Sequence, residues 1–180
     1  MPLEAAFQSL YEKCRRLHDI VNVQVIEKIV LEEEPLRQLR MVGDLGDELI
    51  RFLAAVEPMQ QAAGEARKAA SHPVDLESLR KALGDCQGHF HEVWEPFSIT
   101  LMSREKIASL SELAKRGDQW QLWTDAIRRT LEQCPRPIYE IGVALALGWQ
   151  EIAERGGGVT NIGQQIQVGK HEEFAREGIT

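Results

Sequence analysis

The stretch from Pro137 to Arg155 constrains the fold of this chain more than any other. Between Ile138 and Trp149 it carries a single charge, at Glu140, and small residues alternate with valine and leucine. A helix that is apolar on nearly every face must be covered by neighbouring helices on nearly every side. The apolar part is too short to span a bilayer, which takes about 20 residues. The stretch therefore predicts the central helix of a helical bundle.

The length and composition suit a single globular domain. A chain of 180 residues buries roughly 70% of its unfolded surface, so it needs neither a disulfide nor a metal to fold. The net charge of −7 argues against a generic binder of nucleic acid or anionic membrane, because both surfaces repel acidic proteins. The first ten residues lack the cationic and apolar regions of a secretory signal. We therefore expect a cytoplasmic protein that has no membrane partner, and we do not expect nucleic acid as a partner.

Two long segments carry apolar residues at alternating steps of four and three, the pattern of a helix packed along one side. The first predicts a helix from about Leu3 to Leu31, and the second predicts a helix that ends or bends at Pro96. The apolar positions are Leu3, Phe7, Leu10, Cys14, Leu17 and Val21 in the first segment, and Leu79, Leu83, Cys86, Phe90, Val93 and Phe97 in the second.

The segment between them, residues 36–70, predicts another long helix, which Pro58 must kink or restart. Its alanine-rich end, residues 60–70, is only weakly amphipathic and is consistent with either a helix or an exposed extension. A break follows at residues 71–73, and Asp75 then suits the N-cap position of the next helix.

Two shorter helices are expected before the central one. Ser103 suits the N-cap of the first, and Gly117 is placed to end it. Asp118 suits the N-cap of the second, which carries Trp120 and Trp123 on its apolar side.

No segment before residue 159 alternates apolar and polar residues as a strand does, and no Asn-Gly or Asp-Gly hairpin turn occurs. Short connections make consecutive helices antiparallel. The sequence therefore predicts an all-α fold in residues 1–155: an antiparallel up-and-down helical bundle with four main helices and one or two short ones. A flexible, glycine-hinged C-terminal tail follows in residues 156–180.

The tail supplies three candidate partner-binding residues. Three consecutive glycines at 156–158 predict a hinge, because glycine loses more backbone entropy on ordering than any other residue. Beyond them, Ile162, Ile166 and Val168 are spaced apolar residues in a polar segment. They suit either a disordered terminus or a segment that docks on a partner.

Two Cys–His pairs are candidate metal ligands. Cys14 and His18 are four residues apart, and Cys86 and His89 are three apart, so each pair lies on one face of its helix. If the two pairs faced each other, they would form a tetrahedral zinc site. The cysteines also fit the apolar stripes as buried free thiols, as does Cys134, and this interpretation requires no cofactor.

Asp44, Asp47 and Glu48, within the segment GDLGDELIRFL, place carboxylates at i, i+3 and i+4 of a helix. This segment resembles the second acidic motif of the all-α, MazG-like nucleotide pyrophosphohydrolases. The resemblance implies helical carboxylates that hold magnesium against a nucleoside triphosphate. It departs from the family at Asp44, where the family has Glu, and no earlier Glu-x-x-Glu motif accompanies it. Helix capping explains the same residues without a metal.

Arg67 and His72 have the Arg–His spacing of HEPN-type ribonucleases, which are also all-helical. One match of this kind is expected by chance in a chain of this composition.

One concentration of basic residues completes the candidate sites, and it would form a patch for an acidic partner if its helices are adjacent. Arg128 and Arg129 are its candidate partner-binding residues, and the other members are Lys115, Arg116 and Arg136. The sequence contains no nucleophile elbow and no phosphate-binding glycine motif. We therefore expect a non-enzymatic, regulatory interaction or adaptor module that binds a protein partner, or itself, through a bundle face and the tail. The alternatives are a magnesium-dependent nucleotide pyrophosphohydrolase and a metal-binding helical bundle.

Overall fold

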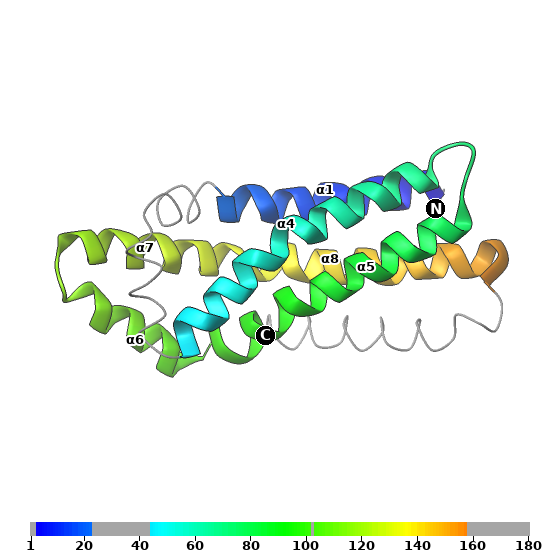
Figure 1. Ribbon diagram of the computed structural model, residues 1–180. Coiled ribbons are helices and arrows are strands. Elements are labelled where there is room, and N and C mark those ends of the chain that lie inside the picture. Colours follow the sequence, from blue (N-terminus) through cyan, green and yellow to red (C-terminus); the bar gives the residue numbers. More distant parts are fainter. Residues whose placement is uncertain (1–2, 23–43, 102, 158–180) are drawn as a thin grey trace.

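The computed structural model describes residues 3–22, 44–101 and 103–157 (Figure 1). This described part is almost entirely helical and contains no strand, which confirms the predicted all-α fold. The elements in chain order are α1 (Leu3–Val21), α4 (Asp44–Ala70), α5 (Leu76–Glu95), the π-helical turn η2 (Pro96–Leu101), α6 (Arg104–Ala114), α7 (Asp118–Gln133), α8 (Pro135–Ile152) and the π-helical turn η3 (Ala153–Gly157).

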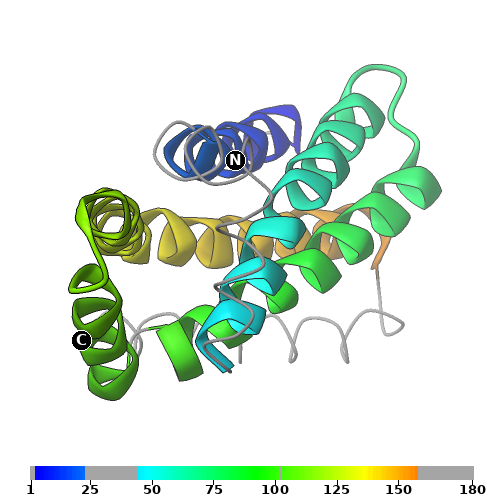
Figure 2. The ribbon, with the colours of Figure 1, turned by 60° about the vertical axis from the view of Figure 1, so that its left-hand side comes forward.

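Four of these helices, α1, α4, α5 and α8, form the bundle. Helix α1 packs against α4 and α8, and α5 packs against the same two helices, so the four close into a ring. Successive members run in opposite directions, and α1 and α5 lie diagonally across the bundle (Figures 1 and 2). This arrangement is the predicted antiparallel up-and-down bundle, but short connections account for only one of its joints. Residues 71–75 join α4 to α5, whereas residues 22–43 separate α1 from α4, and η2, α6 and α7 separate α5 from α8.

The apolar stripes form the core of the bundle. Every residue of the stripe on α1 is buried, and so is every residue of the stripe that runs along α5 into η2. Burying one large apolar side chain contributes about 1.5–3 kcal/mol. The largest fully buried side chains are Trp149, Phe7, Phe52, Phe90 and Phe97.

The central helix α8 is packed closely against its neighbours. A Cβ atom added to Gly148 would lie 3.2 Å from Cζ of Phe7 on α1 and 3.3 Å from Cδ2 of Leu83 on α5. The small residue therefore lets two bulky side chains lie against the backbone of α8. Between Ile138 and Trp149 only Leu147 is exposed, at 41%, so this stretch is covered on nearly every side, as predicted.

The single charge of the central stretch is paired. Oε2 of Glu140 lies 3.6 Å from Nη1 of Arg16 on α1, and its Oε1 lies 3.3 Å from Nε of Arg136 one turn earlier on α8. The carboxylate therefore sits at the edge of the α1–α8 contact, between two cations.

Helix α4 continues through Pro58 to Ala70. Its alanine-rich end is helical, and Ala63, Ala66 and Ala70 are buried, so the alternative of an exposed extension is wrong. Small side chains at these positions allow α5 to lie close. Asp75 caps α5 as predicted, because it accepts a hydrogen bond of 3.1 Å from the backbone N–H of Ser78.

Helices α6 and α7 form a hairpin at one end of the bundle (Figure 2). Gly117 occupies the N-cap position of α7 with φ of 148°, a conformation that favours glycine, and Asp118 is the first helical residue. The predicted capping role of Asp118 is therefore wrong. Trp123 is buried, and its ring meets that of Trp120 edge-on at 5.2 Å between centroids.

The predicted extension of the first helix to Leu31, the start of the second helix near residue 36 and the tail beyond Gly157 lie outside the described residues. Gly156 and Gly157 belong to η3, so the first two glycines continue a helical turn. None of the described helices combines the length and the apolar character that crossing a bilayer requires.

Candidate functional site

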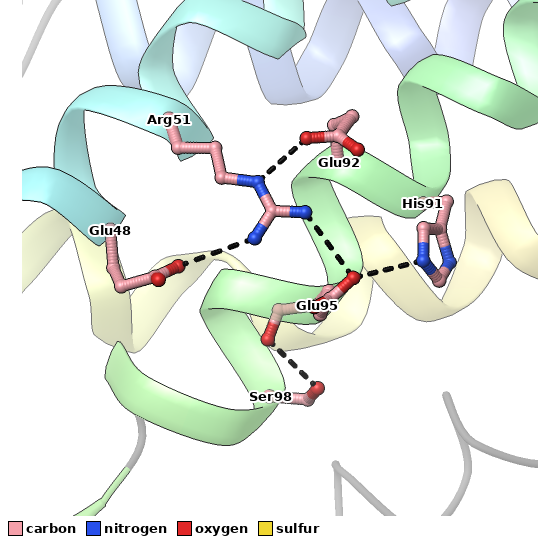
Figure 3. A network of polar contacts seen from close by, with 6 residues as sticks. All are labelled: Glu48, Arg51, His91, Glu92, Glu95 and Ser98. Carbon is pink, nitrogen blue, oxygen red and sulfur yellow. Dashed lines mark hydrogen bonds and ion pairs between the residues drawn. The ribbon is translucent and has the colours of Figure 1, made fainter.

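A network of charged side chains joins the beginning of α4 to the end of α5 (Figure 3). Nε of Arg51 donates a hydrogen bond of 2.6 Å to Oε2 of Glu92, and its Nη2 donates one of 3.2 Å to Oε2 of Glu95. Its third nitrogen, Nη1, lies 3.7 Å from Oε2 of Glu48, one turn earlier on α4. Three carboxylates thus surround one guanidinium group.

The network extends along α5 and into η2. Nε2 of His91 lies 2.9 Å from Oε2 of Glu95, the carboxylate oxygen that also accepts from Arg51. The hydroxyl of Ser98 donates to the backbone carbonyl of Glu95 at 3.4 Å. Glu95 therefore connects Arg51, His91 and the turn where α5 becomes η2.

The position of Arg51 has an electrostatic reason. Glu92 and Glu95 lie in the last turn of α5, where the helix dipole is negative and carboxylates are unfavourable. The hydrogen bond and charge of Arg51 lower the pKa of Glu92, and the hydrogen bond to Glu92 raises the pKa of Arg51. Both groups therefore stay charged at neutral pH. Because the side chains are 34–46% exposed, the pair is weaker than a buried one.

The network includes one member of the acidic segment that resembles the pyrophosphohydrolase motif. Glu48 faces Arg51, whereas Asp47 is exposed, and the side chain of Asp44 lies outside the described part of the structure. The sequence interpretation missed Glu92-x-x-Glu95, because this pair follows the acidic segment in the chain, whereas the family's Glu-x-x-Glu motif precedes it. Glu48, Glu92 and Glu95 contact the guanidinium group of Arg51, which takes the place that a metal ion would occupy between them. Magnesium-dependent nucleotide hydrolysis stays a prediction.

The two candidate zinc cysteines meet in the core between α1, α4 and α5. The side chains of Cys14 and Cys86 are hydrogen-bonded, and Sγ of Cys86 donates to the backbone carbonyl of Met59 at 3.6 Å. The hydrogen bond between Cys14 and Cys86, together with burial, raises the pKa of the Cys14 thiol well above its ordinary value. All three cysteines are free and buried, as one of the two interpretations predicts.

The two candidate zinc histidines are less enclosed than the thiols. His18 lies partly exposed beside Asp19, with Nδ1 3.9 Å from Oδ1, and His89 is half-buried. Within the described ranges, no three His, Cys, Asp or Glu side chains gather in a way that could hold a metal ion. The described geometry therefore provides two sulfur atoms but not a four-ligand site.

Arg67 and His72, the pair with ribonuclease-like spacing, have separate surroundings. The guanidinium carbon of Arg67 lies 3.8 Å from the centroid of the Tyr11 ring, in a cation–π contact with α1. His72 is exposed in the turn between α4 and α5. Arg67 has a packing role that requires no catalytic partner.

The basic residues are divided among several contacts. Arg128 is half-buried and donates a hydrogen bond of 3.3 Å from Nη2 to the hydroxyl of Ser111, which holds α7 to α6. Arg116 lies over the ring of Trp120, at 5.8 Å from its centroid. Arg129, by contrast, is exposed. Of the two predicted partner-binding arginines, Arg129 is thus the one that faces solvent.

An exposed leucine lies on the same side of α7 as Arg129. Leu122 is 49% exposed, and seven residues, or about two helical turns, separate it from Arg129. We call this side the α7 outer face. It comprises the exposed residues Asp118, Leu122, Arg129, Glu132 and Gln133.

The remaining candidates, Ile162, Ile166 and Val168, lie outside the described residues. Comparison of the chain with models of protein families, with curated proteins and with solved structures gave no significant match.

Proposed function

We propose that this chain is a non-enzymatic helical interaction module that binds a protein partner through the α7 outer face and the segment 156–180. The observation that carries the proposal is the exposure of Leu122, 49%, on the same side of α7 as Arg129. Both belong to a hairpin at the end of the bundle, where a partner can approach without disturbing the four-helix core (Figure 1).

The chemistry of the α7 outer face supports a protein partner. Arginine is enriched among the residues that contribute most to protein–protein interfaces, and the exposed leucine adds apolar area that a partner can cover. Covering the leucine completely would contribute about 1.5–3 kcal/mol at most. That contribution alone gives weak binding, so a second contact region is required.

The C-terminal segment is the second region of the proposal. Ile162, Ile166 and Val168 supply apolar anchors, and the charged residues after them favour solubility. A segment that orders on binding loses conformational entropy, which makes its affinity moderate and suits a regulatory role. We place the protein in the cytoplasm, because three free, buried cysteines fit a reducing compartment.

Deleting residues 156–180 and, separately, changing Leu122→Asp tests both regions. We expect each change to reduce partner capture or self-association and to leave the melting temperature nearly unchanged. Pull-down with mass spectrometry measures capture, sedimentation measures self-association, and calorimetry measures the melting temperature.

Val74→Asp is the matched control, because Val74 is 39% exposed in the α4–α5 turn, far from α7 in the chain. It should keep every partner that the unchanged protein retains. A monomeric protein that retains no partner would contradict the proposal. So would partners that Leu122→Asp, Val74→Asp and the deletion retain equally.

A further inference from the structure

A groove of about 410 Å³ opens between α1 and α4 beside Pro58. This volume lies near the lower end of the range for small-ligand sites, about 300–1,000 Å³. Leu53 and Val56 are its apolar lining residues. Val56 is only 1% exposed and forms part of the floor of the groove. His18 closes the groove on the α1 side. The groove uses no residue of the α7 outer face.

Pro58 changes the hydrogen bonding of the helix at this groove. In an α-helix, the carbonyl of Ala54 would accept a bond from the N–H group of residue 58. Proline has no N–H group and cannot supply that bond. Ala54 is exposed and lines the groove together with Pro58. The carbonyl oxygen of Ala54 thus lacks its ordinary helical donor beside this groove.

Pro58 also destabilises the helix. A proline in a helix interior is about 3 kcal/mol less favourable than alanine. Helix α4 nevertheless continues through Pro58, and this leaves one backbone acceptor outside the helical hydrogen bonding. Pro58 therefore has a physical rationale if the carbonyl of Ala54 binds a donor.

The polar residues of the groove favour a cation. Glu57 and Gln61 line it, and among the described residues that line it there is neither lysine nor arginine. A second carboxylate, that of Asp19, lies 3.9 Å from the imidazole of His18 at the rim. A ligand that carries positive charge and several N–H donors complements these acceptors.

We propose that this groove binds a small amphipathic cation of the alkylguanidinium class. The guanidinium group donates to the carboxylate of Glu57 and the carbonyl of Ala54, and the alkyl chain covers Leu53 and Val56. Guanidinium fits because its planar fork presents five N–H donors to neighbouring acceptors.

Titration of the full chain with n-butylguanidinium, followed by ¹⁵N–¹H NMR, tests the proposal. We expect saturable shifts that are centred on residues 53–61 and His18. The neutral analogue n-butylurea has nearly the same shape, and we expect it to bind at least about tenfold more weakly, because one charged hydrogen bond is lost. Equal binding of both compounds, or no shift at the groove, would overturn the proposal.

Two variants test the carboxylate charge of Glu57 and the backbone carbonyl of Ala54 separately. Glu57→Gln should weaken n-butylguanidinium binding about tenfold, whereas the control Glu65→Gln, on the same helix but outside the groove, should not. Pro58→Ala restores an N–H donor to the carbonyl of Ala54, so it should raise the melting temperature and weaken binding. Unchanged binding in both Glu57→Gln and Pro58→Ala would show that the ligand does not use these acceptors, and the assignment would fail.

Discussion

The indole Nε1 of Trp149 donates a hydrogen bond of 2.8 Å to Oε1 of Gln87 and thereby joins α8 to α5 inside the core. The two residues are 1% and 7% exposed. Nε2 of Gln87 is buried and has no hydrogen-bond partner in the described part of the chain. Gln87 therefore satisfies Trp149 while one of its own polar atoms stays unsatisfied.

The first prediction concerns this bond. Gln87→Leu removes the acceptor of the indole N–H group in the core, which costs about 1–3 kcal/mol, and it also removes the unsatisfied Nε2, which offsets part of that cost. The free energy of unfolding should therefore fall by less than about 3 kcal/mol. The same change in a Trp149→Phe background should cost less, because no donor is left unsatisfied. Chemical denaturation of the two single variants and the double variant gives the coupling. Effects that add to within about 0.5 kcal/mol would show that the bond contributes nothing.

The second prediction compares two glycines in helices. Gly148→Ala should destabilise the protein, because its Cβ would lie 3.2 Å from the ring of Phe7, which is fully buried. Overpacking costs about 1–3 kcal/mol, and the gain in helix propensity offsets at most about 1 kcal/mol of that loss. Gly88→Ala is the control, since nothing lies within 4 Å of its added Cβ. It should stabilise the protein by up to about 1 kcal/mol. Equal signs for the two variants would refute close packing at α8.

Helical periodicity was sufficient to predict the bundle. Residues four and three apart share one side of a helix, so the stripes of α1 and α5 identified their buried faces directly. The residues at which helices begin and end were harder to predict. Helix α7 begins after Gly117, whose backbone φ is 148°. Glycine can adopt this angle, but the presence of a glycine does not show that it does so.

The Arg51 network could not be predicted from spacing within one helix. Its members lie on two helices, and they meet only because α4 and α5 form an antiparallel pair around the turn at residues 71–75. Arg51 and Glu95 are equally far along the chain from Pro73, and this symmetry is the signal that would have paired them. The α1–α4 groove also depends on tertiary contacts, since His18 approaches Pro58 from another helix.

The third prediction concerns acid stability. The Arg51 contact lowers the pKa of Glu92 from its ordinary value of 4.5. Its contribution to stability is therefore fully present above pH 4.5 and is lost as the pH falls through the lower folded value. Between about pH 6 and about pH 3, the unchanged protein should lose more unfolding free energy than Glu92→Gln. Urea denaturation at the two pH values measures the difference.

Glu112→Gln controls for the general effect of acid, because Glu112 belongs to a pair with Lys115 that is 72% exposed on both sides. It should behave like the unchanged protein. If Glu92→Gln loses as much stability on acidification as the Glu112→Gln control, then Arg51 does not stabilise the charged form of Glu92.

The fourth prediction concerns the cysteines. The hydrogen bond between Cys14 and Cys86, together with burial, raises the pKa of Cys14. Burial raises the pKa of Cys134 to about 12. A thiol with that pKa is about one part in 10⁴ thiolate at pH 8, and the thiolate is the reactive form. The native protein should therefore react with maleimide far more slowly than the protein in denaturant.

The variant Gln119→Cys supplies an exposed thiol on α7 as the positive control. Mass spectrometry should find one label on the native variant and none on the native unchanged chain. A native thiol of the unchanged chain that reacts as fast as the introduced cysteine would show that α1, α5 or the α7–α8 junction opens readily, and the packing described for the core would then be wrong there.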